Sequence, residues 1–441
     1  MIHRLIAPVL CMAVGLGGCA QWSSGASVAP AASVRTQAWT ETADRTLGFA
    51  RKQKIQHIVV IVQENRSLDN LFNGFPGANT VAVGKNSYGQ TVPLHQERLQ
   101  TRFDLSHKHP AFLVEYDFGK MDGFNLEGVI CRRHCPDRST AAYAFINHKE
   151  VAPYWQMAQQ YVLADDMFQT NQGPSFPAHQ YLISGTSTIA AHSPLRAAEN
   201  PTNQQHQPNE GGCDSAKTAR AETIDSYGHE RNGPFPCYDR ASIMDLMDAA
   251  GVSWKYYEAY GGPGLWNAVD AIKQIWQKPE FHTNVIAPSG QFLKDLAKGD
   301  FANVTFITPT AAASDHAKKT NGTGPAWVAS VVNAIGKSPF WSTTAIFVTW
   351  DDWGGWYDHV KPPQYNSYEL GMRVPLIVIS PYAKTAYVSH KQHEFGSILK
   401  FTEEVFNLGS LGTTDVRSDN LADCFTFGRA PRRFVAISSP L

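Results

Sequence analysis

Four runs of β-branched and other apolar residues stand out along the chain. They cover residues 55–63, 303–307, 344–350 and 374–380. Such nearly continuous apolar runs are typical of strands that are covered on both faces in a parallel sheet. Apolar residues recur at helical spacing between them, over residues 242–250, 267–277 and 327–335. We therefore expect an α/β fold, with a central, mostly parallel sheet flanked by helices on both faces.

Polar residues follow three of these runs at the point where each ends. Glu64 and Asn65 follow the first run, Asp351 and Asp352 follow the run at 344–350, and a short loop leads from the run at 303–307 to His316. In open α/β sheets, ligands bind beyond the carboxyl ends of the strands. The chemistry of this protein is therefore expected at that edge.

The oxygen-bearing side chains of Glu64, Asn65, Asp351 and Asp352 suit a hard divalent cation. We expect one metal ion there, Ca²⁺, Mg²⁺, Mn²⁺ or Zn²⁺. A simpler interpretation of Glu64-Asn65-Arg66-Ser67 is a helix start, with Asn65 or Ser67 as the cap. For this motif taken alone, the simpler interpretation is favoured.

Ser175 is the candidate nucleophile, in the sequence Gly-Pro-Ser175-Phe-Pro177. Pro177 suits a first helical turn, which would place Ser175 at a helix N-terminus that favours a phosphate anion. A plain helix cap is the alternative. The surroundings of Ser175 lack the Gly-x-Ser-x-Gly elbow of α/β hydrolases, so metal activation of the hydroxyl is preferred. Ser175 is thus also a candidate metal ligand.

Three of the 16 histidines stand beside acidic residues or beyond a strand end: His107, His316 and His359. Each could protonate a leaving alkoxide or bind a phosphoryl oxygen. For any one of them taken alone, a structural role is the stronger interpretation.

The chain has 441 residues, 43% of them hydrophobic, with 38 basic and 39 acidic residues. This composition excludes a disordered protein. With a formal charge of -1 and no stripe of Lys or Arg, no nucleic-acid partner is expected. No internal transmembrane helix is expected either.

The N-terminus has the features of an export signal. Residues 1–18 combine basic residues with a short apolar run, and the sequence Leu16-Gly-Gly-Cys19 resembles a bacterial lipobox. We expect a lipidated Cys19 that binds the membrane, a flexible tether over residues 19–50, and a periplasmic or cell-surface lipoprotein. An ordinary signal peptide is the alternative. The remainder, residues 51–441, is expected to form a single catalytic domain.

Export favours disulfides. Among the five cysteines after the signal, the pair Cys213 and Cys237 brackets a polar loop and is the first expected disulfide. Cys131 and Cys135 are interpreted as a disulfide or two inert thiols, because no second pair at zinc-ligand spacing accompanies them. The long polar stretch over residues 192–239 is expected to be an insertion at one rim. It would either shape substrate access or have no function.

Three segments together carry a family resemblance. They are IQHIVVIVQENRSLDNLF at 55–72, GKMDGF at 119–124 and TWDDWGGWYDHVKPP at 349–363. They resemble the bacterial phosphoesterase family, which contains phosphatidylcholine-type phospholipases C and an acid phosphatase branch. The resemblance implies an alkaline-phosphatase-like fold.

The resemblance also assigns roles to residues. It implies metal ligands at Glu64, Asn65, Ser175, Asp351 and Asp352, and phosphate-contacting histidines at His107 and His316. His359 lies within the most specific motif and is a candidate catalytic residue. His282 is a guess for one further active-site histidine. Ala178-His179 stands where the family more often has Asn-Arg, and we expect this change to affect substrate contacts and not the metal.

We therefore expect a metal-dependent hydrolase that cleaves phospholipid phosphodiesters as a phospholipase C, through a phosphoserine at Ser175. Either His107 or His316 would protonate the leaving oxygen. The alternative substrate is a small soluble phosphomonoester, as for an acid phosphatase. An alternative of another class is a non-catalytic exported binding lipoprotein.

Overall fold

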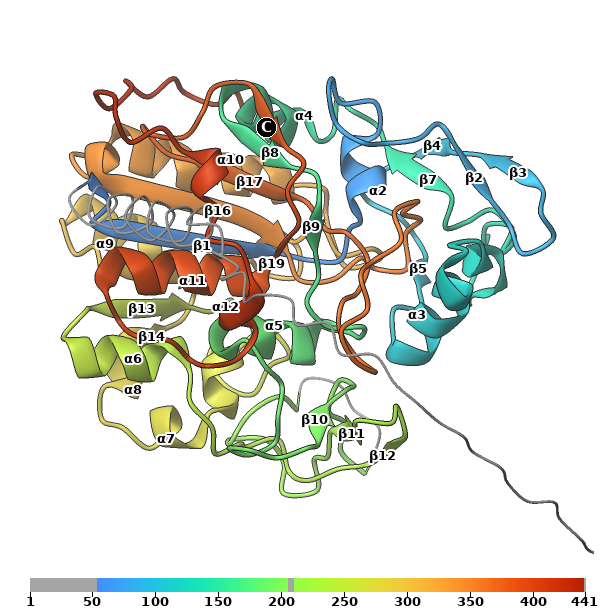
Figure 1. Cartoon of the computed structure of the whole chain (residues 1–441), viewed down its shortest axis with the longest axis horizontal. Helices are drawn as coiled ribbons and strands as arrows, with labels where there is room; N and C mark the ends of the chain where they lie inside the picture. Colours follow the sequence, from blue (N-terminus) through green and yellow to red (C-terminus); the bar gives the residue numbers. More distant parts are fainter. Residues whose placement is uncertain (1–53, 205–209, 440–441) are drawn as a thin grey trace, which may run out of the picture. The chain divides into compact units, whose positions relative to one another are not determined.

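The centre of the molecule is an eight-stranded sheet (Figure 1). The structure is a computed structural model, and it describes residues 54–204 and 210–439. The sheet order is β14-β13-β15-β1-β16-β17-β8-β18. The bounds of its strands are β1 His57–Gln63, β8 Val162–Ala164, β13 Trp254–Tyr257, β14 Val285–Ile286, β15 Val304–Ile307, β16 Thr344–Trp350, β17 Leu376–Ile379 and β18 Tyr387–Ser389.

All pairings in this sheet are parallel except those of β17, which is antiparallel to both β16 and β8. Both long central strands, β1 and β16, are buried along their whole length, because neighbouring strands and helices cover them. The carboxyl ends of β1, β13, β15 and β16 therefore lie at one edge of the sheet.

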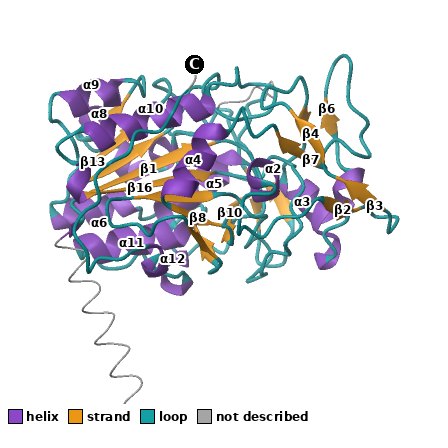
Figure 2. Ribbon diagram, turned by 90° about the horizontal axis from the view of Figure 1, so that it is seen from above, coloured by secondary structure: helices purple, strands orange, loops and turns teal. Residues whose placement is uncertain are grey.

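Helices cover both faces of the sheet, and Figure 2 shows α9 and α10 on one side and α6 and α11 on the other. The helices are α2 Leu68–Phe72, α3 His109–Tyr116, α4 Ala152–Gln160, α5 Ser175–Ser184, α6 Ile243–Ala250, α7 Lys273–Trp276, α8 Phe281–Asn284, α9 Gln291–Ala297, α10 Gly324–Lys337, α11 Phe395–Phe406 and α12 Thr414–Arg417. Among the described residues, no helix is long and apolar enough to cross a membrane. The expected α/β architecture is confirmed.

Small sheets lie outside this frame. Strands β10 Arg196–Ala197, β11 Glu222–Ile224 and β12 Glu230–Asn232 form an antiparallel sheet within the stretch expected to be an insertion. Four two-stranded sheets pair β2 Val83–Lys85 with β3 Thr91–Pro93, β4 His95–Glu97 with β7 Ala144–Ile146, β5 Asp104–Leu105 with β6 Val129–Ile130, and β9 Met167–Phe168 with β19 His393–Glu394.

One expected helix is wrong in part. Residues 267–277 form a 3₁₀ turn, η3 Ala268–Ala271, and then α7, with an extended residue, Ile272, between them. The break has a local cause, because Tyr238 donates its backbone N–H to Ala271 and accepts a hydrogen bond from the N–H of Lys273. This bridge holds Ile272 in a strand-like conformation.

The disulfide Cys213–Cys237 is confirmed, and Cys131–Cys135 forms a second one. Cys424, the remaining cysteine of the described residues, is a buried free thiol. The expected signal peptide and tether, together with Cys19, lie outside the described residues, so these predictions stay predictions.

Candidate active site

Polar side chains from three distant parts of the chain meet at the carboxyl edge of the sheet. The Ser175 hydroxyl lies 3.2 Å from Oε2 of Glu64 and 3.3 Å from Oδ2 of Asp352. The side-chain amide of Asn65 lies 2.7 Å from the same Asp352 oxygen and 3.4 Å from Ser175 Oγ. Asp351 accepts a hydrogen bond from the backbone N–H of Asn65 at 3.1 Å. We call these residues the Ser175 cluster: Glu64, Asn65, Ser175, Asp351 and Asp352.

Local backbone features explain how the cluster is built. Ser175 is the first residue of α5, as expected from Pro177, and the N–H of Phe176 is held by Oδ1 of Asn200 at 2.9 Å. Asn65 has a left-handed backbone with φ of 56°, which asparagine tolerates better than most residues. Gly354 lies against Asn65, where a Cβ would come within 2.3 Å of the Asn65 carbonyl oxygen. The chain can therefore pass this close only with glycine at position 354.

Both interpretations of the first motif are partly right. Ser67 is the N-cap of α2 and accepts a hydrogen bond from the N–H of Asn70 at 3.2 Å. Asn65 and Glu64, however, face the Ser175 cluster. The same four-residue motif therefore starts a helix and supplies site residues.

His179 is a member of this group that the sequence analysis did not place there. Its Nε2 lies 3.0 Å from Oε1 of Glu64 and 3.7 Å from Oδ2 of Asp351. One turn of α5 separates it from Ser175, so both face the carboxylates. This helical spacing could have identified it. The expectation that the change at position 179 concerns only substrate contacts is wrong, because the side chain contacts two of the expected metal ligands.

The three acidic side chains of the Ser175 cluster have no cationic partner from the described residues, so their ionised forms are costly. Glu64, Asp351 and Asp352 are fully buried. Burial, reinforced by Asp351, raises the pKa of Asp352 to about 8 and raises that of Glu64 well above its usual range. His179 is the one basic side chain of the described residues that pairs with these carboxylates, and burial lowers its pKa to about 4. It is therefore neutral at pH 7 and offers no positive charge.

A divalent cation fits this arrangement. Oδ1 of Asn65 and Oδ2 of Asp351 are buried and accept no hydrogen bond. Glu64, His179 and Asp351 offer ligand atoms that all lie within 4.8 Å of one another. Burying several carboxylates without a counter-charge is costly, and a bound cation relieves that cost.

His107 and His316 lie beside each other, with ring centres 5.7 Å apart. Nδ1 of His107 hydrogen-bonds the carbonyl of Leu105 at 2.8 Å, and Nδ1 of His316 hydrogen-bonds the carbonyl of Ala317 at 2.7 Å. In each ring, Nε2 is therefore the nitrogen that can bind a substrate. Burial lowers the pKa of His107, but Asp352 and Asp104 outweigh it, so the net shift is upward. Burial, with the positive charge of Lys319, lowers the pKa of His316 well below its usual value.

His359 belongs to a different group. Its Nδ1 lies 2.6 Å from Asp69, and the Arg373 guanidinium makes two hydrogen bonds, of 2.8 and 3.1 Å, to Asp358. We call these residues the Arg373 cluster: Asp69, Asp358, His359 and Arg373. None of the contacts of His359 among the described residues involves the Ser175 cluster. A catalytic role for His359 stays a prediction, and its surroundings are those of a structural ion-pair network.

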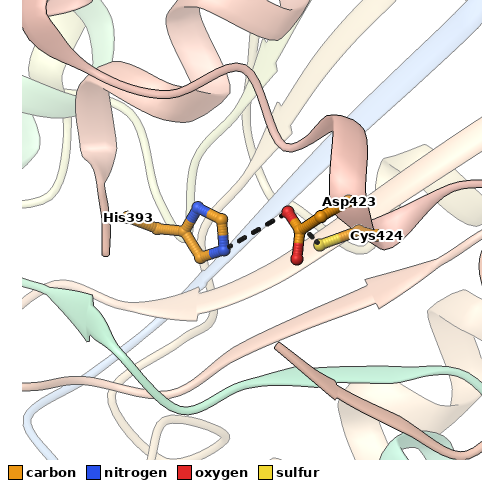
Figure 3. A group of neighbouring side chains, drawn as sticks. All are labelled: His393, Asp423 and Cys424. Carbon is orange, nitrogen blue, oxygen red and sulfur yellow. Dashed lines mark hydrogen bonds and ion pairs between the residues drawn. The ribbon is translucent and has the colours of Figure 1, made fainter. Parts of the chain in front are cut away.

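A third group, shown in Figure 3, contains His393, Asp423 and Cys424. Both ring nitrogens of His393 have partners, Nδ1 with Asp419 at 2.5 Å and Nε2 with Ser389 at 3.1 Å. Burial raises the pKa of the Cys424 thiol well above its usual value. Because the histidine is fully engaged and the thiol stays protonated, this group is a poor ligand set.

The structure places His282, the guess for a further active-site histidine, outside the Ser175 cluster. It lies in α8 and lines a separate cavity with Asp214, Glu258 and Asp270. Helix α8 packs at the β13–β14 end of the sheet, whereas the Ser175 cluster follows β1 and β16.

Comparison with known proteins places the chain in a family. The model of the phosphoesterase family matches residues 55–409. The chain belongs to this family. The prediction that this protein is a hydrolase acting on phosphoric esters is therefore confirmed.

Relatives of the chain are named phospholipases C. The chain is 25% identical to the non-hemolytic phospholipase C of Burkholderia pseudomallei, over 83% of this chain and 57% of that protein. It is 30% identical to non-specific phospholipase C6 of Arabidopsis thaliana, over 81% of this chain and 69% of that protein. The chain spans 53–57% of the length of three bacterial relatives, the phospholipases C of Burkholderia pseudomallei and Pseudomonas aeruginosa.

Among solved structures, a protein of the alkaline phosphatase superfamily from Vibrio parahaemolyticus is similar with a TM-score of 0.37 and 10% identity. The match covers 82% of this chain and 70% of that one.

Proposed function

We propose that this protein is a phosphoric ester hydrolase that cleaves phospholipid phosphodiesters as a phospholipase C, through a phosphoserine formed at Ser175. One observation carries the proposal. The Ser175 hydroxyl stands at the N-terminus of a buried helix, between two carboxylates and an amide that distant segments supply. A plain helix cap would not require these three partners.

The proposed reaction has two steps, formation of a phosphoserine and its hydrolysis. Ser175 Oγ attacks phosphorus while its proton passes to a carboxylate that it contacts, Glu64 or Asp352. The bond from Oγ to phosphorus forms, and the bond from phosphorus to the leaving alcohol breaks. The positive end of the α5 dipole, at which Ser175 lies, favours the anionic phosphoryl group. Water then cleaves the phosphoserine and restores the hydroxyl.

His107 is the better candidate for protonating the leaving oxygen. Its pKa is raised and its Nδ1 is engaged by the Leu105 carbonyl, so Nε2 is the ring atom that can carry a proton toward the substrate. His316, with a lowered pKa, is neutral and suits the opposite role of accepting a hydrogen bond or a proton. The two rings thus form an acid and base pair.

Glu64, Asn65, Ser175, Asp351 and Asp352 would hold one divalent cation, with His179 as a further candidate ligand. The chemistry that such a cation supplies is a lowered pKa of the serine hydroxyl and neutralisation of a phosphoryl oxygen. Oxygen-rich ligands favour Ca²⁺, Mg²⁺ or Mn²⁺, and the histidine makes Zn²⁺ a further candidate.

The names of the relatives support a phospholipid substrate. A cavity of about 130 Å³ lined by Tyr260, Trp266 and Lys319 adjoins the site, because Lys319 donates its backbone N–H to His316 and Trp266 packs with Phe176. This cavity would receive the polar part of a phosphate ester. All three tryptophans of the motif at 349–363, Trp350, Trp353 and Trp356, are buried and cannot contact lipid. The proposed membrane attachment is through a lipidated Cys19, as the lipobox-like sequence suggests. Labelling with a fatty acid in wild type and Cys19→Ala tests it.

The decisive experiment compares hydrolysis of p-nitrophenylphosphorylcholine and p-nitrophenyl phosphate by the metal-loaded protein. Ser175→Ala is expected to abolish turnover and the initial burst of p-nitrophenol. Ser184→Ala is the matched control, because it lies on the same helix and its buried hydroxyl has no hydrogen-bond partner.

Preference for the diester supports the phospholipase C reaction, whereas preference for the monoester at acid pH would assign the chain to acid phosphatases. Equal activity of wild type and Ser175→Ala would overturn the assignment of the nucleophile. No activity with any of the four metals would favour a binding lipoprotein.

A further inference from the structure

A small cavity beside the Ser175 cluster is lined by residues that follow two neighbouring parallel strands. Tyr260 and Trp266 follow β13, and Lys319 follows β15, which pairs with β13. The volume of this cavity is about 130 Å³, and we call it the Lys319 cavity. Because it is smaller than the pockets that hold drug-sized ligands, it can receive a lipid head group but not two acyl chains.

The loop that carries Lys319 is held against the Ser175 cluster. Gln63, which directly precedes Glu64, donates a hydrogen bond from Nε2 to the Ala313 carbonyl of this loop at 3.1 Å. Burial raises the pKa of Glu64 and lowers that of His316, and the positive charge of Lys319 acts to lower both. The ammonium group therefore lies close enough to the reacting groups to contact a substituent of a bound phosphate ester.

Lys319 is the one charged residue of the cavity lining, all of which is described. Its Nζ lies 5.7 Å from the ring centre of Trp266, which is within cation–π distance. In the part of the chain that the structure describes, Lys319 forms no ion pair with a carboxylate. The cavity thus presents a positive charge that no acidic side chain of its lining neutralises.

This charge decides which head groups suit the cavity. Aromatic residues such as Tyr260 and Trp266 can bind a quaternary ammonium group by cation–π contact. Here Lys319 already presents an ammonium group to the Trp266 ring. A second cation in the same small space is repelled, and no carboxylate of the lining offsets the repulsion. The ammonium group of lysine has three N–H donors, which hydroxyl oxygens of a head group can accept.

We infer that Lys319 is a specificity-determining residue that disfavours quaternary ammonium head groups and binds hydroxyl-bearing ones, such as glycerol. The inference rests on the proposed phospholipase C function and names the class of phospholipid that the site would cleave. In that reaction, the head group stays bonded to phosphorus when the phosphoserine forms, and diacylglycerol leaves. The Lys319 cavity therefore holds the head group through the first step.

The first measurement compares hydrolysis of phosphatidylglycerol and phosphatidylcholine with the same acyl chains, in micelles of a neutral detergent, by the metal-loaded protein. We expect kcat/KM to be about tenfold higher for phosphatidylglycerol, and Lys319→Met to abolish most of this preference. Lys318→Met is the matched control, because Lys318 is the exposed neighbour that does not line the cavity. It removes the same charge from the surface and should keep the wild-type preference.

The second measurement is calorimetry of glycerol 1-phosphate and phosphocholine, the two products, which needs no turnover. Wild type and Lys318→Met should bind glycerol 1-phosphate about tenfold more tightly than phosphocholine, and Lys319→Met should lose most of the difference. Equal affinities in wild type, no binding of either product, or an unchanged preference in Lys319→Met would overturn the inference.

The two measurements also separate this inference from the proposed function. If Lys319→Met lowers kcat/KM equally for both lipids, Lys319 binds the phosphoryl group that they share, and the inference is overturned. If wild type discriminates between the products through Lys319 but hydrolyses neither lipid, the proposed function fails and the binding preference of the cavity is supported.

Discussion

Two groups of buried carboxylates follow the same two strands, yet their charges are balanced in opposite ways. After β1 come Glu64 and then Asp69, and after β16 come Asp352 and then Asp358. In the Arg373 cluster, a fully buried guanidinium contacts Asp358 at 2.8 Å and Asp69 at 3.7 Å. In the Ser175 cluster, the paired basic side chain is a neutral histidine.

The comparison teaches how a functional group of charges differs from a structural one. Where the chain supplies its own cation, the carboxylates are satisfied and the cluster joins segments of the fold. Where the chain supplies no cation, the stability of the ionised carboxylates depends on a bound ligand. The predictions below test this distinction with matched substitutions in the two clusters.

The largest expected effect is on catalysis. Asp352→Asn should lower kcat/KM by roughly 10²–10³-fold or more, because it removes a side chain that contacts Ser175. The metal-free variant should be no less stable than metal-free wild type, since one buried charge is removed. Steady-state assays and urea unfolding measure the two quantities. A variant that keeps wild-type activity would contradict the proposed site.

The matched substitution in the Arg373 cluster should lower the free energy of unfolding and leave catalysis unchanged. Asp358→Asn leaves the Arg373 charge without its bidentate partner, which we expect to cost about 3–5 kcal/mol of unfolding free energy. The kcat of the protein that remains folded should stay near the wild-type value. Urea unfolding and active-site titration check this, and a strong loss of kcat without loss of stability would place the Arg373 cluster in catalysis.

Cation binding should stabilise the first cluster and not the second. A divalent cation at one hundred times its Kd should add about 2.7 kcal/mol to the free energy of unfolding. Calorimetry of unfolding, with and without a chelator, measures this gain. Asp358→Asn should retain the gain and Asp352→Asn should lose most of it. Equal gains in both variants would place the cation elsewhere.

The smallest expected effect is a pH dependence of stability from His359. Burial lowers its pKa, but Asp69 outweighs it and the net pKa is raised above 6.5. The stabilisation from the protonated ring is therefore complete below pH 6.5 and is lost as pH rises through the raised pKa. His359→Gln should lack this part of the decline in unfolding experiments across that range. A large fall in kcat for this variant would instead support the catalytic role predicted for His359.

Much of the site could be predicted because each strand end is a local signal. Glu64 and Asp351 directly follow apolar runs whose burial pattern fixes where the strand stops. Ser175 could be assigned to a helix start from Pro177 alone. His179 was misjudged because its contacts with Glu64 and Asp351 depend on the direction in which α5 meets the sheet. His359 lies in the same motif as Asp352, but it contacts Asp69 and Arg373 instead of the Ser175 cluster. No local sequence pattern predicts the contact between His359 and Arg373.

The sequence by itself determined the alternation of strands and helices, the mostly parallel sheet and the edge at which polar residues gather, because these follow from short-range periodicity and strand termination. Tertiary structure alone decided which carboxylates share a charge partner. It brought Arg373 to Asp358 and left Glu64, Asp351 and Asp352 without a cation from the chain. The physical reason is that burial and charge balance depend on neighbours that lie from 15 to 287 residues away in the sequence, beyond the reach of a local pattern.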